Sequence, residues 1–436
     1  MAPSCYRSGR KYRLVPALLA VLLTVPAALA ASSGFLPQSR VGFTTGDQWE
    51  PAIAADGYGH VYILSPQYVT VPLDCPTCPL PTMILVVSND NGSSWQPPRP
   101  IAPAGSGQFD AQIAVDPTDR RTVYAAWLQN NKSDTVVARS ARSTDSGQTW
   151  LVVTADSTNA GTDKPILAVR GQDVYVGYNH AQKVWVSSSH DGGITFTSTN
   201  VNSNAKLGWS LAGGGTVDPA GNVYFAWAGY TQSGGAKGPV NLYTSRSSDG
   251  GRTWVTRLLD ISGAPPDCSA YQCGWAFLGA QITMASDAAG TLYALWNAGT
   301  VDKGPERIYF ASSTTAGATW STKTSISLAR TGVGHAFPAI VAGSAGDVRI
   351  AWMDARNSPL WNTYYRSSTN GGATWSAEKK LSSYVPGYSY ILPNGFSFPF
   401  GDYFEMDIDS RGQTQAVWGE GLNYNTPGSI WYTNGR

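Results

Sequence analysis

The sequence has little charge, few histidines and no phosphate-binding loop, and each shortage excludes a class of function. Charged residues make up 14% of the 436 residues and the formal net charge is +1, so no strong field draws the chain to nucleic acid or to an anionic membrane. The Gly213–Gly215 run lacks the Lys-Ser/Thr that completes a phosphate-binding loop. The four histidines lack the spacing of a metal site or a nucleophilic triad, and they are His60, His180, His190 and His335. We therefore expect no cofactor and no bound metal.

Long apolar runs are also missing, except at the N-terminus. The run from Leu14 to Ala30 follows a basic start and ends in the small-residue site Ala28-Leu29-Ala30. This order predicts a secretory signal peptide in residues 1–31, with export to the extracellular space or periplasm. A retained N-terminal anchor is the alternative. It is disfavoured because the run is short for a membrane span and contains two prolines. We expect no membrane segment in the mature chain.

Cysteine is scarce, and its placement favours local crosslinks. Removal of the signal peptide removes Cys5 and leaves two close pairs, which are Cys75 with Cys78 and Cys268 with Cys273. An even number in an exported chain predicts two disulfide bonds. The C-x-x-C spacing of the first pair leaves a four-thiolate zinc site as an alternative, although export and the wider second spacing argue against it. Free thiols are a third reading.

The mature chain shows no apolar pattern of helical period, but short β-type runs recur seven times. Each copy has a first apolar run, such as AQIAVD at 111–116, and a third run that is rich in Tyr, Ser and Val. Between them stands a second run, which reads VYILS, VYAAW, VYVGY, VYFAW, LYALW, VRIAW or TQAVW. Such copies at a period of roughly 45–65 residues are typical of propeller blades, so the fold is predicted to be all-β.

Six of the seven copies end in a turn that resembles S-x-D-x-G-x-T-W. The turns read SNDNGSSW from Ser88, STDSGQTW from Ser143, SHDGGITF from Ser189, SSDGGRTW from Ser247, STTAGATW from Ser313 and STNGGATW from Ser368. Asp and Ser side chains bond nearby backbone N–H groups, and Gly tolerates positive φ. A catalytic residue would not be repeated six times or lost twice, as it is at Thr315 and Asn370. The acids of the other four turns are therefore expected to be structural, and they are Asp90, Asp145, Asp191 and Asp249.

The two ends of the chain decide the number of blades. The seventh copy stops at Arg436 after its third strand, whereas RVGFT at 40–44 precedes the first inner strand without a blade of its own. We predict that this N-terminal strand supplies the missing outer strand and closes a seven-bladed propeller of four-stranded antiparallel blades. Six blades with an irregular end are the alternative. Residues 32–436 then form a single domain.

The six turns resemble the Asp boxes, or BNR repeats, of the sialidase-like propellers, over about residues 40 to 436. In that family the boxes lie on the face opposite the active site. Asp boxes also occur in other glycosidases, in lyases and in propellers without activity. Sialidases usually have six blades, so seven would be a departure.

The resemblance implies an active site at the top face, where the inner strands begin. Sialidase chemistry uses three arginines to hold a carboxylate, a tyrosine nucleophile whose proton a Glu accepts, and an Asp as acid/base. Three arginines are expected at the top of blades five and six, namely Arg307, Arg330 and Arg356.

The segment GDYFEMD at 401–407 offers Tyr403 as the nucleophile, with Glu405 and Asp402 beside it. The F/Y-R-I-P motif of the family is absent, and Glu50 stands there instead as a further candidate for substrate binding. Asp110 and Asp354 are further top-face acids that could contact a substrate, although polar strand ends that merely face water explain them as well.

These residues support two hypotheses of different classes. The first is a secreted sialidase-like glycoside hydrolase of the exo-sialidase type that acts on glycans at the top face. The alternative is a non-catalytic Asp-box propeller that binds glycans or proteins. The missing F/Y-R-I-P arginine favours the second hypothesis, whereas the top-face arginines and the GDYFEMD segment favour the first. In both cases we expect a monomer with a carbohydrate or glycoconjugate as partner.

Overall fold

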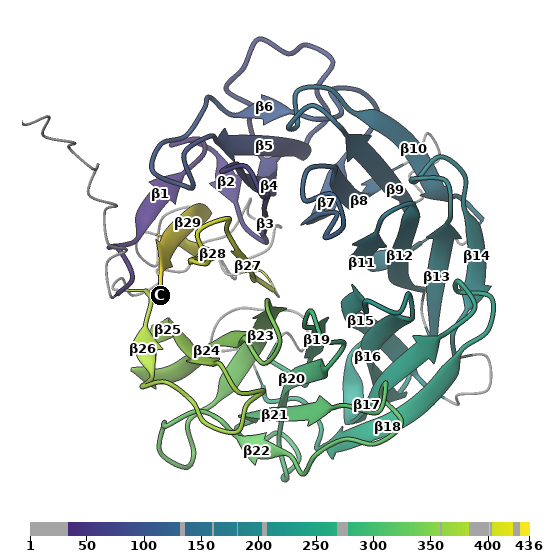
Figure 1. Cartoon of the computed structure of the whole chain (residues 1–436), viewed down its shortest axis with the longest axis vertical. Helices are drawn as coiled ribbons and strands as arrows, with labels where there is room; N and C mark the ends of the chain where they lie inside the picture. The colour runs from purple at the N-terminus through teal and green to yellow at the C-terminus, as the bar shows by residue number, and fades with distance from the viewer. Residues whose placement is uncertain are drawn as a thin grey trace, which may run out of the picture.

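Seven β-sheets surround a central axis in the computed structural model (Figure 1). The structure describes residues 34–130, 136–158, 161–180, 182–202, 207–267, 278–357, 360–382, 401, 403–421 and 428–436. Within these ranges the chain forms strands and turns but no helix. The prediction of a seven-bladed all-β propeller is confirmed, and the six-bladed alternative is wrong. None of the described segments forms a helix that is long and apolar enough to cross a membrane.

Each blade places its strands in chain order from the axis outward, and neighbouring strands are antiparallel. The inner strands are β3 (Ala52–Ala55), β7 (Gln108–Val115), β11 (Asp163–Arg170), β15 (Trp209–Val217), β19 (Ile282–Ser286), β23 (His335–Ala342) and β27 (Glu405–Ile408). The second strands are β4 (Val61–Tyr68), β8 (Val123–Asn130), β12 (Asp173–His180), β16 (Val223–Gln232), β20 (Leu292–Ala298), β24 (Val348–Asn357) and β28 (Thr414–Gly421).

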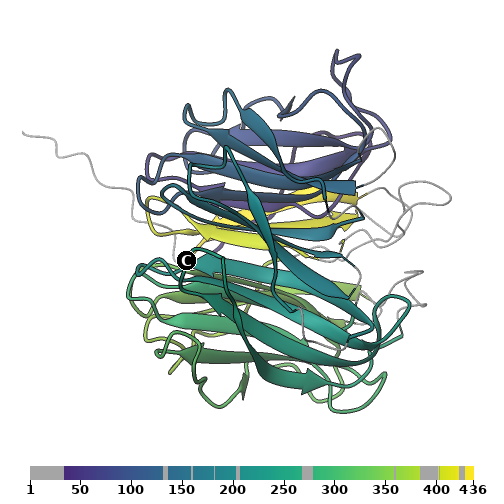
Figure 2. The same cartoon turned by 90° about the vertical axis from the view of Figure 1, so that its right-hand side faces the viewer.

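The third strands are β5 (Thr82–Ser88), β9 (Val136–Ser143), β13 (Lys183–Ser189), β17 (Lys237–Ser247), β21 (Arg307–Ser313), β25 (Leu360–Ser368) and β29 (Gly428–Gly435). The outer strands of the first six blades are β6 (Arg99–Pro100), β10 (Leu151–Asp156), β14 (Thr197–Asn200), β18 (Val255–Ser262), β22 (Thr324–Ser325) and β26 (Lys379–Lys380). A short β2 (Asp47–Gln48) extends the first blade by pairing with β4. Figure 2 shows the stacked strands from the side of the ring.

The N-terminal strand closes the ring, as the sequence predicts. Strand β1 (Ser39–Val41) pairs antiparallel with β29, in the register that sets Ser39 opposite Tyr432 and Val41 opposite Ile430. Figure 1 places β1 beside the C-terminal blade, at its outer edge. Val41 is buried in an apolar cluster that contains residues of both the first and the last blade. The two ends of the chain therefore share one sheet.

The hydrophobic core is divided among the interfaces between neighbouring blades. Each apolar cluster draws residues from two successive blades, because a four-stranded sheet must cover both of its faces. The last residues of five second-strand motifs are fully buried tryptophans, and they are Trp127, Trp227, Trp296, Trp352 and Trp418. Burial of such a side chain stabilises the fold by roughly 3 kcal/mol, so these interfaces carry most of the stability.

The Asp boxes close their own turns and fasten each blade to the one before it. The Asp249 carboxylate accepts hydrogen bonds from the Thr253 hydroxyl, the Thr253 N–H and the Ser247 hydroxyl, which lower the pKa of Asp249 to about 2. Trp95 of the first box packs edge-on against Tyr432 of the last blade, with ring centroids 4.9 Å apart. Gly92 has a φ of +83°, and a Cβ there would lie 1.7 Å from the Tyr432 hydroxyl, so only glycine fits.

Two boxes without the acid keep the same turn. The Thr315 hydroxyl and the Asn370 side-chain oxygen each accept the N–H of the residue four positions later, at 2.9 Å. Both replacements therefore preserve the acceptor that the turn requires. The Asn91 N–H of the first box donates to the carbonyl of Gly59 in the turn after β3, so the boxes lie at the end of the channel where inner strands finish.

A second repeated aspartate, which the sequence reading did not single out, follows several inner strands. Asp218 accepts hydrogen bonds from the N–H groups of Ala220 and Asn222 and from the Tyr224 hydroxyl. Asp287 makes the equivalent bonds, including one from the Tyr293 hydroxyl at 2.8 Å. Both carboxylates are buried, so these acids hold the turn between the first and second strands.

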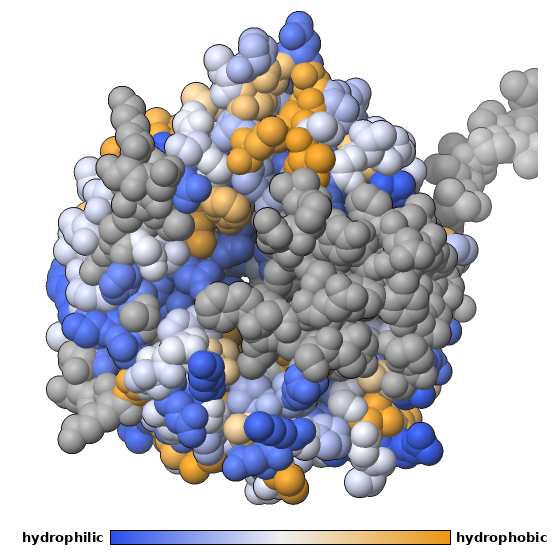
Figure 3. Space-filling model, turned by 180° about the vertical axis from the view of Figure 1, so that it is seen from behind, coloured by the Kyte–Doolittle hydropathy of each residue, from blue (hydrophilic) through white to orange (hydrophobic). Residues whose placement is uncertain are grey.

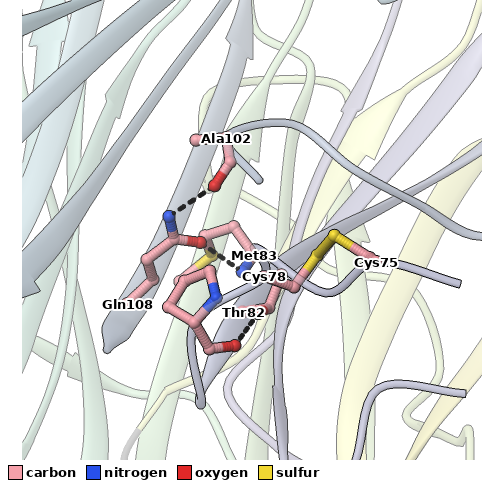
Figure 4. The surroundings of a disulfide bond; sticks show 7 residues. Cys75, Cys78, Thr82, Met83, Ala102 and Gln108 are labelled. Atoms are coloured by element: carbon pink, nitrogen blue, oxygen red, sulfur yellow. Dashed lines mark hydrogen bonds between the residues drawn. A yellow bond between two sulfur atoms is a disulfide. The ribbon is translucent and has the colours of Figure 1, made fainter. Parts of the chain in front are cut away.

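The first cysteine pair forms the expected disulfide bond. Cys75 and Cys78 are linked in the segment between β4 and β5 (Figure 4), which excludes a zinc site built on this pair. Beside it, the buried Gln108 side chain accepts the Met83 N–H at 2.7 Å and donates to the Ala102 carbonyl at 2.8 Å. Cys268 and Cys273 lie outside the described residues.

Removal of β1 should destabilise the whole ring. Deleting residues 34–45 exposes the edge of β29 and removes Val41 from its cluster, so we expect the free energy of unfolding in urea to fall by about 3 kcal/mol or more. Leu36→Ser is the control, because Leu36 is 50% exposed and should be nearly neutral. A deletion variant that melts within one or two degrees of the parent would contradict closure by β1.

Candidate functional site

The inner strands enclose an axial channel whose upper part is a cavity of about 280 Å³. Upper means the end where the inner strands begin. Figure 3 views this top face, where hydrophilic side chains border one side of a hollow near the axis. The charged side chains among the described lining residues are Lys164, Glu405 and Asp407. Gly213 and Gly215 of β15 also line the cavity. A Cβ on Gly213 would lie 2.0 Å from the Ile282 carbonyl oxygen, so this glycine lets the inner strands of the fourth and fifth blades pack closely. The described lining is therefore polar at the upper end of the cavity.

Glu405, at the start of β27, is held by two donors from other blades. Its Oε1 accepts the Gln112 side-chain amide at 2.6 Å, and its Oε2 accepts the Ile53 N–H at 3.2 Å. The Glu405 side chain is half-buried, and its desolvation in the channel raises the pKa of Glu405 to about 8, although both hydrogen bonds act in the opposite direction. A carboxyl group with such a pKa exchanges its proton near neutral pH, which is a property of catalytic acids and bases.

Tyr403 and Lys164 meet beside Glu405. The Tyr403 hydroxyl donates to the Ala111 carbonyl at 3.1 Å, and the Lys164 ammonium lies 3.9 Å from the centroid of the Tyr403 ring. Lys164 is only 4% exposed, so this cation–π contact is shielded from bulk water. The cluster thus combines a phenol, an ammonium and a carboxyl group from the third and seventh blades.

Lys164 reaches this position because its inner strand begins with a bulge. Its φ is +51°, and the pairing of β11 with β12 shifts register between Asp163 and Ile166. Glu50, Asp110 and Phe337 occupy similar places in other blades with φ between 54° and 56°. Such conformations are strained for residues other than glycine and cluster at functional sites. Lys164 is not among the site residues expected from the sequence. The available signal was the residue-Pro pair at the start of an inner strand, which Glu50-Pro51 and Phe337-Pro338 share with it.

Below this cluster the channel widens toward the bottom face. Asp407 lines both the upper cavity and a lower one of about 650 Å³. Its Oδ2 accepts the Ala55 N–H at 2.7 Å, and burial raises the pKa of Asp407 to about 6. Thr216 and Ser286 also line both cavities, so the two form one continuous channel. In the part of the chain that the structure describes, no cluster of three or more His, Cys, Asp or Glu side chains could hold a metal ion.

The three arginines proposed for a carboxylate clamp do not line the upper cavity. Arg307 donates through its guanidinium to the carbonyls of Ser327, Ala329 and Arg330, at 3.1 to 3.2 Å. Arg330 itself is exposed. Arg356 forms ion pairs with Asp354 at 2.6 Å and with Glu378 at 2.5 Å. Two of the three guanidinium groups therefore have internal partners.

Asp354 belongs to the same internal network. It is fully buried, and besides Arg356 it accepts the Trp352 indole N–H at 3.0 Å. Although burial acts in the opposite direction, the hydrogen bonds that Arg356 donates to Asp354 and Glu378 raise the pKa of Arg356. The Arg356 guanidinium also lies 3.6 Å from the centroid of the Tyr364 ring. These contacts join the end of β24 to β25 and to the segment before β26.

The remaining candidates lie near Tyr403. Glu50 is buried, and a Cβ on Gly401 would lie 2.1 Å from its Cγ, so Glu50 packs against the segment that leads to Tyr403. Asp110 directly precedes Ala111, whose carbonyl accepts the Tyr403 hydroxyl. Asp402 lies outside the described residues. The structure thus gathers Tyr403, Glu405, Glu50 and Asp110 at one end of the channel and leaves the arginines with Asp354 elsewhere.

Comparison with known proteins supports the fold. No protein-family model matches the chain, and no curated protein matches its sequence. A protein of unknown function from Dyadobacter fermentans is 12% identical with a TM-score of 0.52, covering 92% of this chain and 98% of that one. An ulvan lyase of polysaccharide lyase family 25, bound to -[GlcA(1-4)Rha3S]-, is 12% identical with a TM-score of 0.53, covering 90% and 95%. The Hadza microbial sialidase Hz136 is 13% identical with a TM-score of 0.49, covering 89% and 66%. The two structures with TM-scores above 0.5 are similar to this chain in fold alone, since identities this low carry no statement about activity.

Arg356 should matter for stability because its removal leaves buried carboxylates without their partner. We expect Arg356→Ala to lower the free energy of unfolding by about 3 kcal/mol, the scale for breaking a buried ion pair. Urea unfolding followed by tryptophan fluorescence measures the change. The matched control is Arg330→Ala, which removes an exposed guanidinium and should change stability by less than about 0.5 kcal/mol. Equal losses in the two variants would contradict the structural role of the Arg356 network.

Proposed function

We propose that this chain is a secreted glycoside hydrolase that binds a glycan at the top of its axial channel. The observation that carries the proposal is the cluster of Tyr403, Glu405 and Lys164 at the head of the upper cavity. A glycosidase with a tyrosine nucleophile requires a phenol and a base that accepts its proton, and the Lys164 ammonium adds a shielded cation beside them. Secretion rests on the signal peptide proposed for residues 1–31, and the Cys75–Cys78 disulfide fits an oxidising compartment.

In this proposal Tyr403 attacks the anomeric carbon and forms a glycosyl-enzyme intermediate. The Ala111 carbonyl orients the hydroxyl but cannot take its proton, so Glu405 in its ionised form accepts it. The Lys164 ammonium over the ring stabilises the negative charge that develops on the phenol. Asp402 remains the proposed acid/base for the leaving group. Hydrolysis of the intermediate by water then returns Tyr403 to its free form.

The proposed substrate is an acidic glycan. Lys164 is the one cationic side chain among the described residues that line the upper cavity, and it can neutralise a sugar carboxylate. In this proposal the sugar carboxylate is bound by Lys164 of β11, on the opposite side of the channel from β27, and not by the three arginines. The ulvan lyase with a similar fold holds a glucuronate-containing fragment, so uronate-containing oligosaccharides belong beside sialosides in the substrate panel.

A non-catalytic glycan-binding propeller is the second candidate. The internal partners of Arg307 and Arg356 favour it, because these guanidinium groups would have to leave existing bonds to clamp a substrate. A panel of fluorogenic glycosides, together with calorimetric titration of the same sugars, separates the two. Binding of an acidic sugar without release of the fluorophore would favour the binding protein. Release of the fluorophore would establish the hydrolase.

Removal of the Tyr403 hydroxyl should abolish turnover and leave binding intact. We expect Tyr403→Phe to lower kcat by at least ~10³-fold and to change the Kd of an acidic sugar by less than about twofold, because only the nucleophilic oxygen is lost. Tyr309→Phe is the matched control, since Tyr309 also lies under a lysine, Lys323, but on the third strand of blade five. Unchanged turnover in Tyr403→Phe would exclude the tyrosine mechanism.

The pH dependence of kcat/KM should report Glu405. A general base acts only when ionised, and the folded-state pKa of Glu405 is raised to about 8. We therefore expect kcat/KM to rise about tenfold per pH unit below pH 8 and to level off above it. Glu405→Gln should remove this rising limb together with most of the activity. A rate that instead falls through pH 8 would mean that Glu405 donates a proton and would contradict its role as base.

A further inference from the structure

One side chain, Gln112 of β7, connects three blades at the head of the channel. Its Nε2 donates to Glu405 Oε1 of the seventh blade at 2.6 Å and to the Ala111 carbonyl at 3.1 Å. Its Oε1 accepts the Leu167 N–H of the third blade at 3.2 Å. The Ala111 carbonyl also accepts the Tyr403 hydroxyl, so Tyr403 and Glu405 share this one support.

The bond to Leu167 fixes which end of the amide faces Glu405. A flipped amide would set its NH₂ group against the Leu167 N–H, donor against donor, and would turn its oxygen toward the Glu405 carboxyl group. Only the observed orientation satisfies both neighbours. Gln112 is therefore a donor to Glu405 in every state of that carboxyl group.

The two contacts of Glu405 are unequal, which selects one oxygen for the proton. The Gln112 amide is 2.6 Å from Oε1, whereas the Ile53 N–H is 3.2 Å from Oε2. Because the shorter bond requires a lone pair on Oε1, the neutral carboxyl group carries its proton on Oε2. Each donor also favours the ionised form over the neutral one.

We propose that Gln112 is a positioning residue, which fixes the rotamer of Glu405 and selects the oxygen through which Glu405 exchanges its proton. The inference rests on the proposed function, in which Glu405 accepts the proton of Tyr403. A merely structural role would leave the titration of Glu405 unchanged once the protein is folded. The titration of Glu405 therefore distinguishes the two roles.

The composition of the chain makes this titration practical. It contains five glutamates, and they are Glu50, Glu306, Glu378, Glu405 and Glu420. With ¹³C in the glutamate carboxyl groups, NMR follows each one in the substrate-free mature protein, and the resonance that Glu405→Gln removes identifies Glu405. We expect Gln112→Leu to move the Glu405 midpoint upward by about one pH unit, because the ionised form loses its closest donor.

Two further variants keep the test decisive. Gln112→Glu retains an acceptor for the Leu167 N–H but places a carboxyl group against Glu405, so the two should titrate as a coupled pair with one raised midpoint. If Gln112→Leu fails to fold, the Gln112→Glu variant still tests the inference. The matched control is Gln281→Leu, because Gln281 lines the same cavity and is equally exposed at 8%, and it should leave the Glu405 midpoint in place.

The outcomes separate this inference from the proposed function. A Glu405 midpoint that stays within about 0.2 units in the folded Gln112 variants, or that moves equally in Gln281→Leu, would overturn the positioning role. The titration uses no substrate, so its result does not depend on whether the protein cleaves a glycoside. Where turnover is measured, Gln112→Leu should lower kcat about tenfold or more and change KM less than twofold, as expected for a group that acts only in the transition state.

Discussion

Closure of the ring is the constraint on which the rest of the structure depends. Every blade has two apolar faces, and among the described residues each face is covered mainly by the neighbouring blade. An open row of seven sheets would leave two large faces in water, so the pairing of β1 with β29 and the packing of Trp95 on Tyr432 matter well beyond their own contacts. A closed ring also forces seven inner strands to converge on one axis, which creates the channel.

Convergence of the inner strands explains why stability and candidate chemistry share the same residues. Each inner strand is the edge of its sheet. Its N–H groups that point away from the sheet therefore need hydrogen-bond acceptors inside the channel. Glu405, Asp407 and Gln112 supply acceptors to Ile53, Ala55 and Leu167. The carboxyl group that is best placed for proton transfer is thus also a cap on a neighbouring strand. This double role explains how a half-buried acid is tolerated in the channel.

The propeller contains many acids whose local structure accounts for them without catalysis. Box acids such as Asp249 hold a turn at the bottom edge, and acids such as Asp287 hold the turn after an inner strand. Asp354 anchors Arg356 at the far end of β24. Asp249 and Asp354 make these contacts within their own blade, and Asp287 adds one bond from the Gly346 N–H of the next blade at 2.8 Å. Glu405 differs, because its partners come from the first and second blades and it lines a cavity.

Local sequence determined the fold, the boxes and the first disulfide, because strand periodicity, turn chemistry and Cys75–Cys78 pairing depend on residues within a few positions of one another. Chain order also placed Tyr403 and Glu405 at the start of the last inner strand. Tertiary structure alone decided the rest. Gln112 and Glu405 are 293 positions apart and meet only because the ring closes. Lys164 reaches Tyr403 through a bulge, and Arg356 turns to Asp354 and Glu378 because burial leaves those carboxylates in need of a partner. No local pattern encodes such long-range contacts, since they depend on how seven blades pack around one axis.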